Sequence, residues 1–215
     1  MTPREAAVTE RPILMNGAMV RATLDGTKSQ TRRVMKRQPE YPIVIAGDPH
    51  TNRYQMEGRE AVTLASLLRE CPYGQPGDRL WVRETWRSTG DGGRADYLAP
   101  SDMQPHPVWY DADGAAPAER CVGKTRVSIH MPRWASRILL AIVSVRVERL
   151  NDCSEADARA EGITLEDRHM RGYCAGEYLP PAIRAYSELW DEINGAGSWA
   201  ANPWVWVVEF KRVTP

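Results

Sequence analysis

The stretch Gly26-Thr27-Lys28-Ser29-Gln30-Thr31-Arg32-Arg33 decides the fold that we expect. It follows a predicted strand at residues 12–15 and a short helix that begins at Asn16 and ends at Gly26. A second strand is predicted at residues 31–35. A lysine, a hydroxyl and two guanidiniums therefore lie at a junction between a helix and a strand. Exposed backbone N–H groups and fixed positive charges at such a junction suit a phosphate or a polarised carbonyl.

This segment leaves more than one interpretation open. Lys28 could act as a general base if burial lowered its pKa. An ordinary basic loop would carry the same residues and bind nothing. A phosphate-binding P-loop is excluded, because that motif needs Gly-Lys-Ser/Thr in direct sequence.

The composition is that of a globular protein. Of the 215 residues, 42% are hydrophobic and 26% are charged, which excludes an intrinsically disordered chain. Basic and acidic residues number 28 each, so the net charge is zero. Basic residues nevertheless concentrate at residues 11–37 and 124–149, and acidic residues at 151–167. The two basic segments would form a positive face if they folded together. The alternative is a solvated surface with acids nearby in space.

Local sequence excludes several classes of protein. No run of about 18 apolar residues is present, as a membrane span requires, and residues 1–10 lack the apolar core of a signal peptide. No Cys-x-x-Cys occurs among the widely spaced Cys71, Cys121, Cys153 and Cys174, which argues against a zinc site and a disulfide scaffold. We therefore predict a cytoplasmic protein with reduced thiols, no metal and no cofactor.

Strands are expected to outnumber helices. Further strands are predicted at residues 79–86, 138–150 and 204–210, and further helices at residues 60–71, 154–162 and 181–193. Ser154 and Asp157 resemble a capping box. Because the strands are not joined in βαβ units, we predict an α+β fold in which a small β-barrel is decorated by short helices.

The predicted organisation is a single domain with a tail and two insertions. Residues 1–10 are expected to be a disordered tail, and residues 11–212 to form the domain. The insertions are placed around residues 38–72 and 88–123, which are rich in Gly and Pro.

Glu84 is the candidate acid of a site. Alternation along its predicted strand puts Glu84 on the same face as two apolar residues. A carboxylate with apolar neighbours either pairs with a cation or has a raised pKa. Paired with Lys28 or Arg33, Glu84 would form an acid–base or substrate-orienting site. The alternative is a structural ion pair with Arg83 or Arg137.

Tryptophan and arginine lie close together in two segments, at residues 81–87 and 133–137. Unpaired bases stack on aromatic rings and on guanidinium planes. The candidate binding residues for RNA or a nucleoside are therefore Arg32, Arg33, Trp81, Arg83, Arg133, Trp134 and Arg137. The alternative is that the tryptophans belong to the core, which we predict for Trp190, Trp204 and Trp206 and leave open for Trp81 and Trp134.

The opening stretch resembles the signature of the ASCH domain, in the pattern Gly26-x-Lys28-x-x-Thr31-x-Arg33. Three further segments resemble elements of that domain in the same order: Gly77-Asp78-Arg79 before a strand, residues 143–150 before a capped helix, and residues 207–210 as the closing strand. Residues 129–137 and 202–206 are similar to an uncharacterised phage and prophage branch. The resemblance implies a PUA-like β-barrel, a fold that is linked to RNA.

The resemblance leaves several functions open, because the fold hosts several. The first expectation is a protein that binds RNA or a nucleotide-like ligand, with DNA as a further candidate partner. Some small family members are amidohydrolases that remove the acetyl group of N4-acetylcytidine, and Lys28 and Thr31 match their catalytic lysine and threonine. The family's glutamate does not carry over, because Ala141 lies near its place, so Glu84 would have to act instead. A third alternative is a non-catalytic protein-interaction module.

Overall fold

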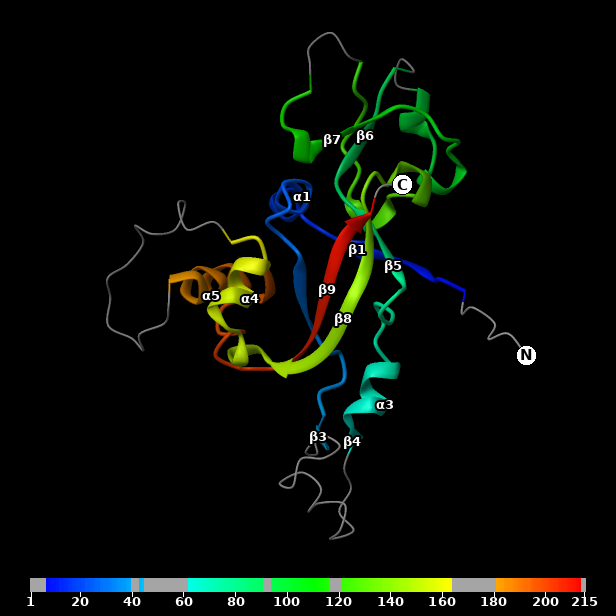
Figure 1. Cartoon of the computed structure of the whole chain (residues 1–215). Helices are drawn as coiled ribbons and strands as arrows, with labels where there is room; N and C mark the ends of the chain where they lie inside the picture. The colour runs from blue at the N-terminus through cyan, green and yellow to red at the C-terminus, as the bar shows by residue number, and fades with distance from the viewer. Residues whose placement is uncertain are drawn as a thin grey trace, which may run out of the picture. The chain divides into compact units, whose positions relative to one another are not determined.

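The computed structural model describes residues 7–39, 43–44, 62–90, 94–116, 121–163 and 181–213 (Figure 1). Its strands are β1 (Glu10–Leu14), β2 (Gln30–Val34), β3 (Ile43–Val44), β4 (Val62–Thr63), β5 (Arg79–Arg83), β6 (Trp86–Ser88), β7 (Val108–Tyr110), β8 (Leu139–Arg149) and β9 (Trp204–Val213). Its α-helices are α1 (Gly17–Leu24), α3 (Leu64–Arg69), α4 (Glu155–Ala160) and α5 (Pro181–Asn194). Short 3-10 turns include η3 (Asp111–Asp113), η4 (Ser128–His130) and η5 (Arg133–Ala135).

Five strands form a mixed sheet in the order β1-β5-β8-β9-β2. β1 is parallel to β5, whereas β5 pairs antiparallel with β8, and β2 antiparallel with β9. The strands β1 and β2 are the two edges, so no closed barrel is detected in the described part of the chain. The prediction of an α+β chain is confirmed, and the prediction of a closed barrel is not.

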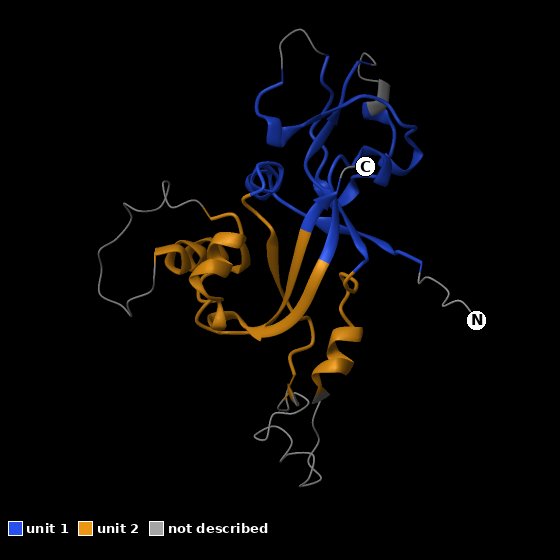
Figure 2. Cartoon of the chain, in the orientation of Figure 1, with its two compact units in different colours: residues 1–26, 77–142, 211–215 blue, residues 27–76, 143–210 orange. Residues whose placement is uncertain are grey.

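The chain divides into two compact units (Figure 2). Unit 1 comprises residues 1–26, 77–142 and 211–215, and unit 2 comprises residues 27–76 and 143–210. The bounds of β8 and β9 show that each of these two strands begins in one unit and ends in the other.

Two helices begin at the caps that the sequence predicts. Asn16 caps α1, because its side chain accepts a hydrogen bond from the N–H of Met19 at 2.9 Å. Ser154 and Asp157 form a reciprocal capping box at the start of α4. Gly26 and Gly162 follow the two helices with φ of 78° and 84°, a conformation that glycine adopts at little cost.

The strand predicted at residues 79–86 is divided into β5 and β6. β5 ends at Arg83, and Trp86 then forms a bridge with Arg126, whose N–H and C=O it meets at 2.9 and 3.1 Å. The chain therefore changes its hydrogen-bonding partner between the two strands, and Glu84 lies in the break. Sequence alternation alone gave no signal of this change of partner.

Other element boundaries also differ from prediction. The helix expected at residues 60–71 is the shorter α3, because Thr63 is its N-cap and accepts from the N–H of Ser66 at 3.2 Å. Glu10, which the expected tail includes, pairs with Arg79 in the sheet. Residues 1–6 of that tail, and residues 45–61 of the first insertion, lie outside the described residues. In the second insertion, Val108–Tyr110 form the strand β7, which was not predicted and which pairs with β6.

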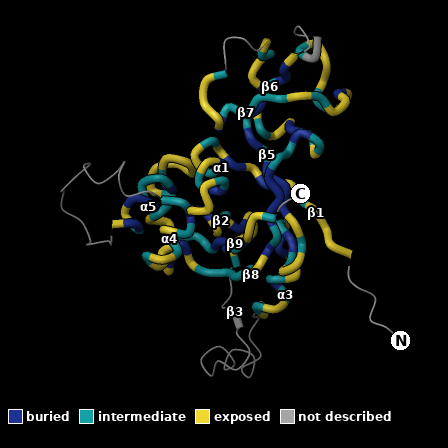
Figure 3. The backbone as a smooth tube through the Cα atoms, turned by 45° about the horizontal axis from the view of Figure 1, so that its top comes forward, coloured by how far each residue is buried: buried dark blue, intermediate teal, exposed yellow. Residues whose placement is uncertain are grey.

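The two faces of β9 belong to different apolar clusters. Val205 and Val207 pack with buried residues of α4 and α5. Trp206, on the opposite face, packs with Met35 and with Leu67 of α3. Figure 3 shows the buried residues, in dark blue, gathered on the central strands. The predicted core positions of Trp190 and Trp206 are confirmed, whereas Trp204 is half-buried.

Replacing Ser154 by alanine should lower the free energy of unfolding by about 1 kcal/mol, because the N–H of Asp157 loses its capping acceptor. Chemical denaturation monitored by circular dichroism measures the loss. Ser187→Ala is the matched control, since Ser187 lies within α5 and its hydroxyl only donates to the carbonyl of Arg184. Equal stability of the two variants would contradict the assigned role of the capping box.

Candidate functional site

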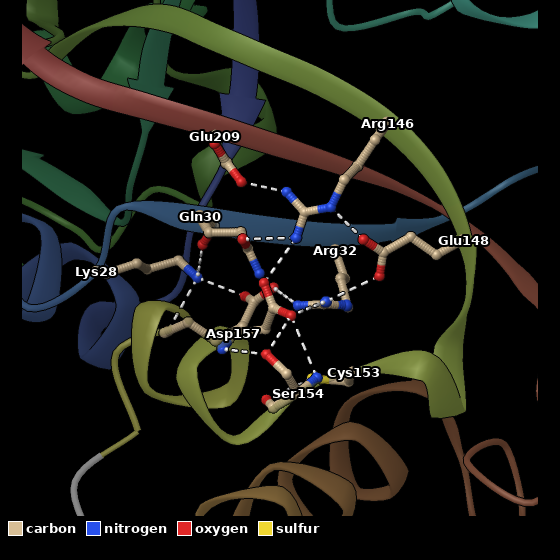
Figure 4. Close-up of polar contacts among 10 residues, drawn as sticks. Lys28, Gln30, Arg32, Arg146, Glu148, Cys153, Ser154, Asp157 and Glu209 are labelled. Carbon is tan, nitrogen blue, oxygen red and sulfur yellow. Dashed lines mark hydrogen bonds and ion pairs between the residues drawn. The ribbon is translucent and has the colours of Figure 1, made fainter.

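Lys28 is fully buried and all three of its N–H groups have acceptors (Figure 4). Its Nζ lies 2.7 Å from the carbonyl oxygen of Gln30, 3.0 Å from the carbonyl oxygen of Glu161 and 2.8 Å from Oε2 of Glu161. The exposed fraction of the Lys28 side chain is 0%. In this conformation the ammonium has no donor left for a ligand.

The position of Lys28 follows from the edge of the sheet. β2 is an edge strand, and the segment before it runs beside the C-terminal end of α4, where the N–H of Ser29 donates to the carbonyl of Ala160 at 2.9 Å. Carbonyl groups at a strand edge and at a helix end lack partners within their own element. Lys28 satisfies one of each, and its charge is balanced by the carboxylate of Glu161.

Arg32 and Arg146 extend this contact into a cluster of ions within unit 2. Arg32, whose side chain is also 0% exposed, lies 3.1 Å from Glu148 and 3.5 Å from both Asp157 and Glu161. Arg146 contacts Asp157 at 2.6 Å and the side-chain oxygen of Gln30 at 3.1 Å, and it also pairs with the carboxylates of Glu148 and Glu209. We call Lys28, Gln30, Arg32, Arg146, Glu148, Asp157, Glu161 and Glu209 the ion cluster.

Burial sets the electrostatics of the ion cluster. Desolvation lowers the pKa of Lys28, although the Glu161 carboxylate opposes that shift. For Asp157, burial would raise the pKa, but the hydrogen bonds from Ser154 and the charges of Arg32 and Arg146 together lower it. Burial raises the pKa of the neighbouring Cys153 thiol to about 12, so this cysteine is not a thiolate at neutral pH.

Thr31 does not share the environment of the ion cluster. Successive side chains of a strand point to opposite faces, and the side chains of Gln30 and Arg32 contact the ion cluster. Thr31 and Arg33 therefore face the other side of β2, where Arg33 lies opposite Trp206 in the register. The resemblance pairs Lys28 with Thr31 as catalytic residues. The Lys28 side chain lies in the ion cluster, whereas the Thr31 side chain lies on the other face of β2.

Glu84 pairs with Arg137, an alternative that the sequence had left open. The carboxylate of Glu84 accepts from Nε and Nη2 of Arg137 at 2.9 and 3.0 Å. Burial raises the pKa of Glu84, and the Arg137 guanidinium opposes that shift. Lys28 has Glu161 as its carboxylate partner, so Glu84 and Lys28 are not each other's partner, and they belong to different units.

The structure brings Trp81, Arg83 and Arg133 together on one face of unit 1. The Cζ atoms of Arg83 and Arg133 lie over the Trp81 ring, at 4.6 and 5.9 Å from its centroid. Trp81 is 7% exposed, so the ring itself is buried. Arg83 donates from Nη1 to the carbonyl of Ile129 at 3.1 Å, and Arg133 from Nε to Glu10 at 3.0 Å.

Trp134 belongs to a different group. It packs edge-on against Trp86, with ring centroids 5.9 Å apart, and lies 4.9 Å from the ring of His106. Trp86 belongs to the apolar cluster that includes Met103 and Met131, and Trp134 packs against that cluster. Trp134 is half-buried and therefore contributes mainly to packing.

Sequence analysis missed the acids that define the ion cluster. The capping box predicted a role for Asp157 at the start of its own helix, but no contact with residues far away in the sequence. Glu161 had no signal, because its burial depends on the contact between the end of α4 and the edge of β2, which are far apart in the sequence. Two buried donors of the ion cluster, Nε2 of Gln30 and Nε of Arg32, have no partner among the described residues.

Part of the positive charge of the two basic segments is neutralised by nearby acids. Each of five arginines from the two segments contacts a carboxylate within its own unit: Arg11, Arg32, Arg133, Arg137 and Arg146. This agrees with the alternative of basic residues that have acids nearby in space.

Within the described ranges, no group of three or more His, Cys, Asp or Glu residues could hold a metal ion. No helix in the same ranges has the length and apolar character needed to cross a membrane. Comparisons with protein-family models, curated proteins and solved structures found no match to the chain.

Replacing Lys28 by methionine should lower the free energy of unfolding by about 3–5 kcal/mol, because the carboxylate of Glu161 is left buried without its ammonium partner. Lys28→Met with Glu161→Gln should recover part of that loss, since no unpaired buried charge remains. Urea denaturation of the two single variants and the double variant measures the coupling. Lys36→Met, at an exposed lysine of the same segment, is the control. Additive losses would contradict the pairing.

Acid should remove the stabilisation that Asp157 provides. Its pKa is lowered in the folded protein, so its contribution is present above the unfolded pKa of about 4 and is lost as the pH falls through the folded pKa. The difference in unfolding free energy between the wild type and Asp157→Asn should therefore be largest near pH 7 and shrink below about pH 4. A difference independent of pH between 7 and 2.5 would refute this assignment.

Proposed function

We propose that the protein is an ASCH-like member of the PUA-like superfamily that binds RNA or a nucleotide-like ligand. The binding surface is the face of unit 1 around Trp81, here called the Trp81 face, which comprises Glu10, Pro12, Leu14, Arg79, Trp81, Arg83, Ile129 and Arg133. The observation that carries the proposal is that two guanidiniums lie over one tryptophan ring.

The register of the sheet explains how these residues meet. Arg79, Trp81 and Arg83 alternate along β5 and so share one face, opposite Glu10, Pro12 and Leu14 of the neighbouring β1. The exposed apolar side chains of Leu14 and Ile129 accompany them. Guanidinium groups over the buried Trp81 ring, beside exposed aliphatic side chains, suit the stacking of unpaired bases.

The Trp81 face carries an excess of positive charge. Its acid, Glu10, lies 3.0 Å from Arg133 and 3.7 Å from Arg79, so two arginines share one carboxylate. Arg83 bonds to a neutral carbonyl. The face therefore holds three guanidiniums and one carboxylate, although the whole chain is neutral. The side chain of Arg133 is 45% exposed, and its Nη groups are suited to phosphate oxygens.

The ion cluster has a different role in this proposal. Lys28 and Arg32 of the signature hold β2 to the end of α4 and do not themselves contact the ligand. The signature therefore builds the scaffold, and the Trp81 face binds.

A second candidate function, hydrolysis of the acetyl amide of N4-acetylcytidine, is favoured by one observation. Lys28 has a lowered pKa and contacts a carboxylate, as a general base would require. The buried position of all three N–H groups and the orientation of Thr31 argue against it. Release of cytidine from N4-acetylcytidine, lost in Lys28→Ala, would support the hydrolase, and absence of turnover would exclude it.

Replacing Arg133 by glutamine should weaken binding of a single-stranded oligoribonucleotide about tenfold, because one stacking plane and one phosphate partner are removed. Fluorescence anisotropy at several salt concentrations measures the affinity, and the salt dependence should become shallower. Arg159→Gln is the control for loss of one exposed arginine, since Arg159 pairs with Glu155 on α4.

Two outcomes would contradict the binding proposal. One is that the wild type binds neither RNA, DNA nor nucleosides. The other is that Arg133→Gln and Arg159→Gln lose the same affinity, which would show that only the net charge matters.

A further inference from the structure

Arg137 presents a guanidinium whose two edges are bound by two different carboxylates. Glu84, 1% exposed, holds the edge formed by Nε and Nη2. Asp113, 36% exposed, binds the other edge, with Nη1–Oδ2 at 2.8 Å and Nη2–Oδ1 at 2.7 Å. The ring of Tyr110 lies 3.9 Å from Cζ, and its hydroxyl donates to the carbonyl of Ala135. The buried Glu84 and the half-buried Tyr110 therefore hold the guanidinium in place, and the exposed Asp113 binds its other edge.

The turn that carries Asp113 receives two more arginines. Arg87 of β6 donates from Nε to Oδ1 of Asp111 at 2.9 Å. Arg21 of α1 donates from Nη1 to the carbonyl of Ala112 at 3.2 Å. Three arginines from separate parts of unit 1 thus converge on the three residues of η3, which we call the acidic turn.

These arginines use few of their donors on the acidic turn. Arg21 and Arg87 each bond to it through one nitrogen. The acceptor of Arg21 is a neutral carbonyl, so its charge contacts no carboxylate within the described part of the chain. A guanidinium forms its strongest contacts with the paired oxygens of a carboxylate or phosphate. Arg21 and Arg87 therefore have N–H groups that do not bond to the acidic turn and that a ligand with more oxygens could bind.

We infer that Arg21, Arg87 and Arg137 form a binding site for two neighbouring phosphate groups, and that the acidic turn occupies this site as an internal competitor. The carboxylates of Asp111 and Asp113 occupy the positions that the two phosphate groups would take. The turn ends at Gly114, whose φ of 93° marks a change of backbone direction that glycine permits. The site does not rest on the Trp81 face, because none of its three arginines belongs to that face.

The charges around Arg137 favour displacement of the turn. Glu84 alone neutralises this guanidinium, so Asp113 is a second carboxylate on one cation, and the two acids repel each other. A phosphate ligand would replace Asp113 at the same edge and would gain further donors from Arg21 and Arg87. Adjacent phosphates occur both in a small pyrophosphate compound and along a polynucleotide backbone.

Binding of inorganic pyrophosphate by isothermal titration calorimetry tests the site. Asp111→Asn with Asp113→Asn removes the competing charges and should bind pyrophosphate at least about tenfold more tightly than the wild type. Adding Arg21→Gln and Arg87→Gln to that variant should abolish the gain. The control is Asp25→Asn with Asp102→Asn, which changes the charge of unit 1 equally at two exposed acids. Asp113→Asn alone should give a smaller gain in pyrophosphate affinity. This single variant still tests the site if the double variant fails to fold.

A single-stranded oligoribonucleotide distinguishes the two sources of phosphate. If the backbone is the ligand, the double variant should also bind RNA more tightly, and the salt slope should steepen by about 0.7 per added phosphate contact. If only pyrophosphate binds more tightly, the ligand is a small phosphate compound, whatever happens at the Trp81 face. A gain no larger than that of the Asp25→Asn, Asp102→Asn control, for both probes, would overturn the inference.

Discussion

The buried contact between Lys28 and Glu161 is the constraint on which unit 2 depends. An ammonium and a carboxylate removed from water are stabilised only when their hydrogen bonds are complete, and here every N–H of Lys28 has an acceptor. The same lysine satisfies one carbonyl group at the edge of β2 and one at the end of α4. The sheet can therefore end at β2 without exposing those carbonyl groups to solvent or to another chain.

This constraint separates structure from binding within one sequence motif. The Gly26–Arg33 stretch combines lysine, threonine and arginines, and each of these residue types suits a ligand. Burial assigns Lys28 and Arg32 to the ion cluster, while Thr31 and Arg33 face the other side of β2. The binding residues that we propose lie in unit 1, where arginines lie over Trp81 and converge on the acidic turn.

Much of the fold could be predicted from the sequence because its signals are local. The caps at Asn16 and Ser154 and the apolar run that becomes β8 depend on neighbouring residues, and all were found. The break after Arg83 could not be predicted, because it arises when Trp86 takes Arg126 as its partner, a contact between distant parts of the chain. Whether the sheet closes into a barrel likewise depends on contacts between its edge strands, which are far apart in the sequence.

The site was less predictable than the fold, for a physical reason. Sequence shows which side chains carry charge but not which of them share a buried volume. Glu84 was found as a buried acid, and Arg137 was among its expected partners. Glu161 and the acidic turn were not found, because their roles come from tertiary contacts alone.

The central claim is that the signature around Lys28 is structural and that the Trp81 face binds the ligand. Ultraviolet crosslinking of a single-stranded oligoribonucleotide, with the crosslinked peptides located by mass spectrometry, tests it most directly. We expect crosslinks within residues 79–83 and 129–133 and none within residues 28–33. Crosslinks confined to residues 28–33 would contradict it.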